Sequence, residues 1–386
     1  MQDFSFHNPC QIEFGRSRAA AFAAAVKKIS GNVLLLYGGG SIKKNDVFDL
    51  LTAEMDKAGI AFIELSGVKP NPGIDSVREG VRLCREHGPG LVLAAGGGSV
   101  IDCAKAIAIG AEYDGDPWDF FTGKAEIHSA LPVACWLTLA ATGSEMNGNT
   151  VISNRETKEK LHAGSPLIIP KVSLLDPRST CTLPPLQTAA GTADIMSHVF
   201  EQYFSAEKES YLQDRMAEAV LRTCVTWAPV AIMEPENPEA RNQLMWAGTI
   251  ALNGLLGCGK GGDWATHMME HEVSAITDMT HGIGLAILTP YWMDYIFDAD
   301  SQPGFAALAR EVWSINETDD VEAGRKGIAA LRQFFLDMDI PVRLRDAGVT
   351  EAMLPVIASQ TVRRGPVGGY RSLQEADVLQ ILKAAW

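Results

Sequence analysis

Short apolar runs in the first half of the chain predict buried β-strands. Residues 33–37 (VLLLY) and 91–95 (LVLAA) are continuous apolar runs, and each leads into Gly-Gly-Gly-Ser. The other elements expected in this half are strands at residues 61–65, 132–137 and 172–175 and helices at residues 47–58, 74–87 and 100–109. Strands that alternate with helices predict an α/β domain with a doubly wound, mostly parallel sheet.

The second half of the chain changes to a helical pattern. The stretch 182–192 (TLPPLQTAAGT) carries two prolines, and beyond it no convincing strand is found. Helices are expected at residues 211–233, 239–256, 305–315, 321–338, 351–362 and 373–386, with Gly257 ending the second of them. We therefore expect an α/β domain over residues 1–183 and an all-α domain over residues 184–386.

Composition limits the classes of protein to which the chain can belong. Hydrophobic residues make up 47% and charged residues 21%, as in an ordinary soluble globular protein. A net charge of −14 argues against nucleic-acid and anionic-membrane partners. No apolar run reaches about 18 residues and no signal peptide is evident, so a membrane protein is not expected. Seven cysteines without a C-x-x-C pair fit a reducing, cytoplasmic location.

Two further helical windows carry potential metal ligands. The window 192–205 has Thr192 as a plausible cap, and the window 263–276 has Asp263 in the same role. On the first window Asp194 lies four residues before His198, so both side chains share one helix face. The second window repeats this spacing with histidines.

Those histidines complete a set of possible metal ligands. His267 and His271 share one face, and His281 follows just before a new apolar run. One carboxylate and several imidazoles suit a borderline ion such as Fe²⁺ or Zn²⁺. A structural role is the alternative for any single histidine, but the two pairs together favour a metal site.

The glycine turns predict a nucleotide site in the α/β half. A strand that runs into glycines and then a helix presents N–H groups and a positive dipole end to a phosphate. The turn at residues 96–99 fits this description, with Asp102 one turn further on. The strand end at residues 137–145 (LTLAATGSE) adds hydroxyl groups. Neither turn has the G-x-G-x-x-G spacing of a standard Rossmann fingerprint.

The turn at residues 38–41 bears on the choice of cofactor. NAD sites usually place an acidic residue against the ribose 2′-hydroxyl, where it would repel a 2′-phosphate. Here the turn is followed by Ile42, Lys43 and Lys44, and no acidic residue occurs before Asp46. This pattern favours NADP(H) over NAD(H), although the lysines could instead form a solvated helix start.

Taken together, these motifs resemble the iron-containing alcohol dehydrogenase family. The resemblance runs nearly from end to end and rests on residues 4–15, the Pro-Asn-Pro at 70–72, GGGSVID at 96–102, ATGSE at 141–145, DWATH-x3-H at 263–271 and the Asp-plus-three-His set. It is greatest to the branch of NADP(H)-dependent aldehyde reductases and butanol dehydrogenases. It implies a dehydroquinate synthase-like fold, with a nucleotide in the N-terminal domain and a divalent metal in the helical domain.

The resemblance also assigns residues. It implies that Asp194, His198, His267 and His281 hold the metal, and that His271 lies near the nicotinamide as a proton-relay residue. The implied cofactor contacts are Gly38, Gly39 and Ser41 at the adenosine end, Gly97, Gly98 and Ser99 at the pyrophosphate, Asp102 at the nicotinamide amide, and Thr138, Thr142, Asn147 and Lys160 at further positions. Many NAD-using members have an Asp within the first turn, and this chain does not.

The resemblance implies an interdomain hydride-transfer site for small or medium aldehydes and primary alcohols, in a homodimer. Two rival interpretations use the same residues. His267 to His271 matches H-x-x-E-H, an inverted zinc-peptidase pattern with Glu270 as general base. A non-catalytic protein that binds nucleotide and metal is the other. Relatives that synthesise dehydroquinate or oxidise glycerol have different ligand sets, which the Asp-plus-three-His pattern disfavours.

Overall fold

The computed structural model describes residues 1–207 and 209–386. The chain divides into two compact units: His7–Leu183, and Met1–Phe6 together with Pro184–Trp386. The first six residues thus belong to the unit that contains the C-terminal half. The two units are described separately.

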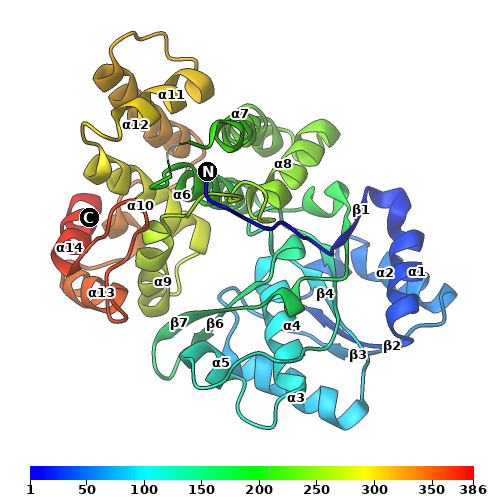
Figure 1. Ribbon diagram of the computed structural model, residues 1–386. Coiled ribbons are helices and arrows are strands. Elements are labelled where there is room, and N and C mark those ends of the chain that lie inside the picture. The colour runs from blue at the N-terminus through cyan, green and yellow to red at the C-terminus, as the bar shows by residue number, and fades with distance from the viewer. Residues whose placement is uncertain (208) are drawn as a thin grey trace. The chain divides into compact units, whose positions relative to one another are not determined.

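The first unit is built on a six-stranded parallel sheet (Figure 1). Its strands, in spatial order, are β1 (Gln11–Phe14), β8 (Val172–Leu175), β5 (Val133–Leu137), β4 (Val92–Gly96), β2 (Asn32–Tyr37) and β3 (Ala61–Leu65). The expected strands and the parallel α/β class are confirmed. The short edge strand β1 was not predicted.

Helices cover both faces of this sheet. Alternate strand residues such as Val33 and Leu35 pack against α1 (Ala19–Ile29) and α2 (Val47–Lys57), whose Phe22 and Leu51 are fully buried. In Figure 1, α3 (Ile74–His87) and α4 (Gly98–Ala111) lie across the sheet from α1 and α2. Burial on both faces explains why the central strands are continuous apolar runs.

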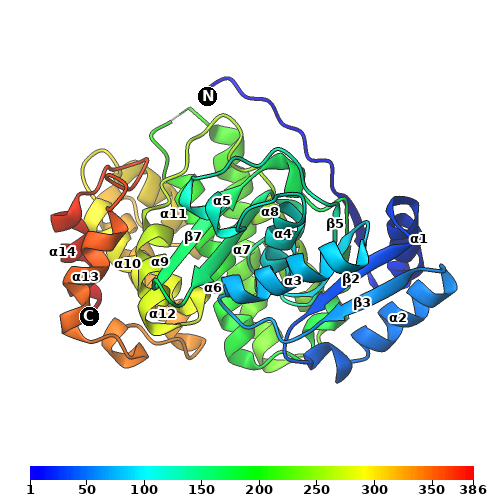
Figure 2. The ribbon, with the colours of Figure 1, turned by 90° about the horizontal axis from the view of Figure 1, so that it is seen from below.

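An antiparallel hairpin extends from this unit. It consists of β6 (Asn149–Asn154) and β7 (Glu159–Gly164), which pack against α4 and the short α5 (Trp118–Thr122) (Figure 2). Neither strand was predicted, because both are polar and lack an apolar run. The hairpin brings Lys160 into the unit, where it is 5% exposed.

The second unit is helical, and among the described residues it has no strand beyond isolated bridges. Its helices are α6 (Pro185–Tyr203), α7 (Tyr211–Met233), α8 (Pro238–Ala251), α9 (Ala265–Thr277), α10 (His281–Ile296), α11 (Gln302–Trp313), α12 (Asp320–Asp337), α13 (Leu354–Thr361) and α14 (Glu375–Ala385). α6 is the central helix, buried continuously from Thr188 to Tyr203 and packed against α7, α8, α9 and α10.

Several helix boundaries differ from those expected, and those of α6, α8 and α9 change the interpretation of caps and ends. α6 begins at Pro185, so Thr192 is not a cap, and its hydroxyl donates to the Thr188 carbonyl at 2.9 Å. α8 ends at Ala251, well before Gly257. α9 begins one residue later than a cap at Asp263 would require, although the Asp263 carboxylate accepts the Ala265 N–H at 3.0 Å.

By length and composition, α7 is the one helix of the described residues that could cross a membrane. The expectation that no apolar run reaches about 18 residues still holds, because charged residues such as Arg215, Glu218 and Arg222 interrupt α7. The helix packs against α6, α8 and α11 and buries Ala217, Leu221 and Cys224. Its apolar face thus belongs to the core of the helical unit.

Candidate functional site

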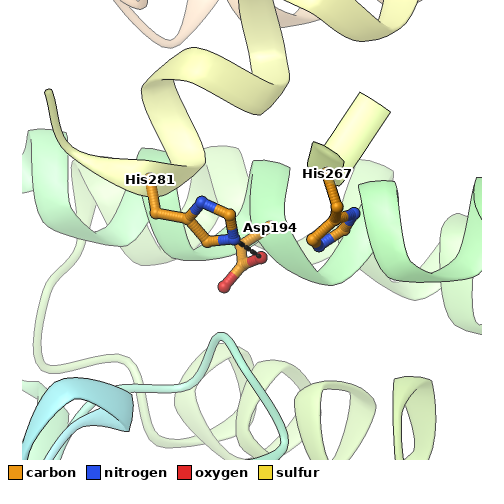
Figure 3. A group of neighbouring side chains, drawn as sticks. All are labelled: Asp194, His267 and His281. Atoms are coloured by element: carbon orange, nitrogen blue, oxygen red, sulfur yellow. Dashed lines mark ion pairs between the residues drawn. The ribbon is translucent and has the colours of Figure 1, made fainter. Parts of the chain in front are cut away.

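Three segments of the helical unit bring together Asp194 from α6, His267 from α9 and His281 from the first turn of α10. Each offers one ligand atom, and these atoms all lie within 4.8 Å of one another. Figure 3 shows the two rings turned toward the region of the carboxylate, with His281 Nε2 3.8 Å from Asp194 Oδ1. Asp194 and His267 are buried, and His281 is partly exposed.

His198 joins this group from one turn further along α6. Its Nδ1 lies 3.5 Å from Asp194 Oδ1, and its ring centroid lies 4.7 Å from that of His267. Burial, together with the nearby His267 and His281, lowers the pKa of His198 well below its usual value. A neutral ring is the form in which histidine binds a metal.

His271 lies next to the same group. Its ring centroid is 5.5 Å from that of His281 and 6.3 Å from that of His267. Glu270, His271 and His281 also offer ligand atoms within 4.8 Å of one another. The geometry thus places His271 within reach of the ligand group, whether as a ligand or as a proton-relay residue.

Buried nitrogen atoms show that these residues fit a metal ion. His267 Nε2 and His198 Nδ1 are fully buried and make no hydrogen bond within the described part of the chain. Burying a polar atom without a partner costs roughly 1–3 kcal/mol. A divalent ion among these nitrogens and the Asp194 carboxylate would satisfy them, and the set of donors suits Fe²⁺ or Zn²⁺.

Two buried glutamates lie behind the histidines, and neither role was predicted from the sequence. Glu201 contacts His267 Nδ1, and Glu270 contacts His281 Nδ1. Burial lowers the pKa of His267, but the charge of Glu201 and its hydrogen bond outweigh burial, so the pKa is raised overall. A signal existed for Glu201: with Asp194 and His198 it occupies positions i, i+4 and i+7 of one helix face.

Glu270 is not placed as a peptidase base would be. Its two carboxylate oxygens contact His281 Nδ1 and the Ser274 hydroxyl. A general base must reach a water bound at the metal, whereas this carboxylate is hydrogen-bonded to the far side of the ligand candidate His281. The geometry does not support the H-x-x-E-H interpretation.

In the α/β unit, the predicted nucleotide turns all follow the carboxyl ends of neighbouring parallel strands. Tyr37 lies opposite Ala95, and Gly96 lies opposite Leu137, so the segments that follow all start at the carboxyl ends of neighbouring strands. Ligands of open α/β sheets bind at such strand ends. The Thr138 N–H donates to the Gly96 carbonyl at 3.0 Å, which joins two of these segments.

Close packing explains the glycines of the second turn. A Cβ atom on Gly98, the first residue of α4, would lie 2.5 Å from the Thr142 side chain. A Cβ on Gly97 would lie 3.0 Å from that of Leu139. The start of α4 therefore lies against the segment that contains Thr142, with Ser99 in its first turn.

The first turn is more open. Gly40 has a left-handed φ of 94°, and Ser41 begins the short 3₁₀ helix η2 (Ser41–Lys43). A Cβ on Gly38 would approach the Val68 carbonyl to 3.2 Å, but a Cβ on Gly39 would meet nothing within 4 Å. Gly39 therefore leaves space beside the backbone.

Lys43, which follows this turn, contacts a carboxylate and two aromatic rings. Its Nζ lies 3.3 Å from Glu64 Oε2 and over the rings of Tyr37 and Phe48. Glu64 is on β3, and its proximity to the first turn was not evident from the sequence. The lysine expected to favour a 2′-phosphate thus already has a carboxylate neighbour.

The remaining predicted cofactor residues surround α4. Asp102 Oδ1 accepts from the Ser144 hydroxyl at 2.6 Å, and Oδ2 accepts from the Val151 N–H at 2.9 Å. The Asn147 amide donates to the Gly143 carbonyl at 2.9 Å. These bonds hold Asp102 and Asn147 in fixed orientations within one wall of the unit.

Lys105 is a further residue of this wall whose role was not predicted from the sequence. It is fully buried, and its Nζ donates to Ser144 Oγ at 2.8 Å and to the carbonyls of Asn147 at 2.8 Å and Asn149 at 2.9 Å. Burial lowers the pKa of Lys105 to about 8. A lysine within the apolar helix pattern of residues 100–109 was the available signal.

Comparison with known proteins agrees with this architecture. The model of the family described as iron-containing alcohol dehydrogenase matches residues 9–177. The model described as the C-terminal part of the Fe-containing alcohol dehydrogenase family matches residues 188–386. Together the two models span both units.

Individual relatives cover nearly the whole chain. NADH-dependent butanol dehydrogenase B of Clostridium acetobutylicum is 48% identical, with 99% of each chain covered. NADPH-dependent aldehyde reductase YqhD of Escherichia coli is 39% identical, with 95% of this chain and 94% of the relative covered. The crystal structure of NADH-dependent butanol dehydrogenase A from Thermotoga maritima superposes with a TM-score of 0.96 at 41% identity, covering 100% of this chain and 99% of the other. The chain belongs to the iron-containing alcohol dehydrogenase family.

Proposed function

We propose that this chain transfers hydride between NADP(H) and small or medium aldehydes or primary alcohols, using Fe²⁺ or Zn²⁺. The observation that carries the proposal is that Asp194, His267 and His281 offer ligand atoms within 4.8 Å of one another, with His198 beside them. Butanol dehydrogenases and an aldehyde reductase among the relatives support this class of substrate.

In this proposal the four residues Asp194, His198, His267 and His281 hold the metal. The bound ion would supply Lewis acidity toward the substrate oxygen, and the nicotinamide would supply the hydride chemistry. Three neutral imidazoles and one carboxylate leave a divalent ion with net positive charge. His271, buried next to His281, is proposed to pass the proton exchanged with the substrate oxygen.

The nucleotide is proposed to bind at the carboxyl ends of the parallel strands. Gly38, Gly39 and Ser41 would contact its adenosine end, and the N–H groups at the start of α4 would contact the pyrophosphate. The further contacts proposed are Gly97, Gly98, Ser99, Asp102, Thr138, Thr142, Asn147 and Lys160. The Ser144 and Val151 contacts of Asp102 would fix its carboxylate for the nicotinamide amide.

The preference for NADP(H) is proposed from the open space beside Gly39 and from Lys43 and Lys44. The Glu64 carboxylate beside Lys43 opposes it, and the relatives include both NADH-dependent and NADPH-dependent enzymes. The ratio of kcat/KM with NADPH to that with NADH, followed at 340 nm, decides the matter. A ratio above one supports the proposal, and a ratio below one contradicts it.

His267→Ala tests the proposal that the helical unit binds the metal and the α/β unit binds the nucleotide. This variant is expected to lose bound metal and turnover while it still binds NADPH, because His267 belongs to the helical unit and the nucleotide turns to the other. Metal content and NADPH titration are the measurements. Loss of NADPH binding with metal retained would contradict the proposal.

We further propose a homodimer in the cytoplasm. Light scattering of the purified protein tests the oligomeric state, and fractionation of the source cells tests the location. An assay over a panel of aldehydes, with and without chelator and added Fe²⁺ or Zn²⁺, would identify both substrate and metal. Turnover that is indifferent to chelation would contradict a metal-dependent mechanism.

A further inference from the structure

We propose that Glu201 and Glu270 are positioning residues that fix the tautomer and orientation of His267 and His281, and that they differ in what they require. Glu201 has to be a carboxylate, whereas position 270 needs only a hydrogen-bond acceptor for His281. The inference rests on the proposed metal site. It concerns Glu201 and Glu270, which contact the ligand candidates from behind, at Nδ1 of each ring.

Glu201 receives hydrogen bonds from three directions. Its Oε1 accepts the Thr266 N–H at 2.7 Å and the His267 N–H at 3.2 Å. Its Oε2 contacts His267 Nδ1. The glutamate is fully buried, so no water replaces any of these partners. Glu201 therefore holds both the His267 ring and the first turn of α9.

This contact determines which nitrogen of His267 faces the metal site. A carboxylate beside Nδ1 keeps the proton on that nitrogen, which leaves Nε2 with a lone pair. Nε2 is the buried atom without a hydrogen bond within the described residues. The orientation shown in Figure 3 is thus the one that a ligand requires.

Glutamine cannot replace Glu201 in this environment. If its oxygen faces the two backbone N–H groups, its amide donates to His267 Nδ1 and forces the proton onto Nε2. If its oxygen faces Nδ1 instead, its amide hydrogens meet the N–H groups of Thr266 and His267. The first orientation therefore gives His267 the wrong tautomer, and the second sets buried N–H donors against one another.

Glu270 has a different set of neighbours. Its Oε2 contacts His281 Nδ1, and its Oε1 contacts the Ser274 hydroxyl. The same hydroxyl also lies 3.1 Å from the Met279 carbonyl. Because a hydroxyl has a single hydrogen, it can donate to only one of these two oxygens at a time.

Glutamine fits position 270 for this reason. Its oxygen can accept from His281 Nδ1 while its amide donates to the Ser274 oxygen. The Ser274 hydrogen is then directed to the Met279 carbonyl, so each of these groups has a partner. His281 keeps the tautomer that leaves Nε2 toward Asp194.

The test measures metal affinity in the full-length protein. Metal-free wild type, Glu201→Gln, Glu270→Gln and Glu270→Ala are titrated with Co²⁺ against a competing chelator, and the visible Co²⁺ spectrum reports the ligand set. Loss of such a partner behind a ligand typically weakens binding by about 10- to 100-fold. We expect this loss in Glu201→Gln and Glu270→Ala. Glu270→Gln should stay within about threefold of wild type, with the wild-type spectrum.

A matched control separates positioning from general destabilisation. Glu218→Gln changes another fully buried glutamate of the same unit, which contacts the Tyr203 hydroxyl and Arg215 instead of a histidine. It should keep wild-type affinity even where its metal-free melting temperature falls. Equal weakening in Glu218→Gln would overturn the inference.

Two further outcomes would overturn it. One is Glu201→Gln binding Co²⁺ as wild type does, and the other is Glu270→Gln being as weak as Glu270→Ala. Failure of the wild type to bind Co²⁺ or Zn²⁺ would instead remove the proposed metal site, and the inference with it.

Discussion

At the scale of single residues, the α/β unit places a positive charge where no solvent reaches it. Lys105 is fully buried in α4, and oxygen atoms of residues 144–149 surround its ammonium group. A buried charge is tolerated only when it is well hydrogen-bonded. Lys105 thus holds the segment that contains Asn147, a proposed cofactor contact.

Replacement of Lys105 by Met is expected to destabilise the α/β unit by about 3 kcal/mol or more near pH 7. The Ser144 hydroxyl and the carbonyls of Asn147 and Asn149 would lose their buried donor. Nucleotide affinity should fall with it, because this segment forms one wall of the proposed site. Urea unfolding and NADPH titration are the measurements, with exposed Lys57→Met as the control.

The same lysine makes stability depend on pH. Its pKa is about 8 in the folded protein, against about 10.4 in an unfolded chain. Between these values the unfolded state binds more protons, so the free energy of unfolding should rise with pH by roughly 1.4 kcal/mol per unit. Below about pH 8 this contribution levels off at its minimum.

To isolate this effect, the stability of the wild type is compared with that of Lys105→Met from about pH 7 to about pH 11, a range that brackets the two pKa values. The difference in stability between the two proteins should widen above pH 8. Parallel curves over that range would show that Lys105 keeps its proton in the folded protein. The Lys57→Met difference should stay flat.

At the scale of elements, one glycine sets how closely two helices of the metal site approach. A Cβ on Gly282, in the first turn of α10, would lie 1.9 Å from the Ala190 carbonyl of α6. Gly282 follows His281 directly, and α6 carries Asp194. The close approach of these helices places the two ligand candidates side by side.

Gly282→Ala should therefore push α10 away from α6. We expect a loss of about 3 kcal/mol in the stability of the helical unit, together with weaker metal binding. Gly261→Ala is the control, because a Cβ there would meet nothing within 4 Å. Thermal unfolding of both metal-free variants is the measurement, and equal melting temperatures would refute the steric argument.

Elements were predictable from the sequence where their own residues determine them. The strands at residues 33–37 and 91–95 are apolar because helices cover both faces of the sheet. β6 and β7 escaped prediction because their pairing with each other and their contact with α4 stabilise polar sequences. The sequence pattern placed the start of α6 too late, because two adjacent prolines are typical of a loop, whereas Pro185 is here a favoured first helical residue.

At the scale of the whole molecule, the candidate site could be predicted only in part. The four-residue spacings singled out the pairs Asp194/His198 and His267/His271, because a helix brings such pairs onto one face. Glu270 behind His281 and Glu64 beside Lys43 depend on the packing of separate elements, so spacing alone gave no sign of their roles. The residues that contact a candidate ligand or cofactor residue from another element therefore become known only from the structure.

The proposed metal ion and the proposed NADPH should protect different parts of the chain from hydrogen exchange. Metal should slow amide hydrogen exchange in α6, α9 and the start of α10, because its ligand candidates tie these helices together. NADPH should instead protect residues 96–102 and 138–149. Exchange followed by mass spectrometry, with each ligand alone, checks this expectation. Protection of residues 96–102 by metal alone would contradict it.

The edge of the sheet has a consequence for how the α/β unit acquires its structure. β1 pairs with β8, with Gln11 opposite Val172, so the first strand of the chain needs the last strand of the sheet as its neighbour. Contacts between residues so distant in sequence are slow to form, because a long loop must be closed first. During synthesis on the ribosome, β1 must therefore wait until residues 172–175 have emerged, and a chaperone that holds the nascent chain would find it still unpaired.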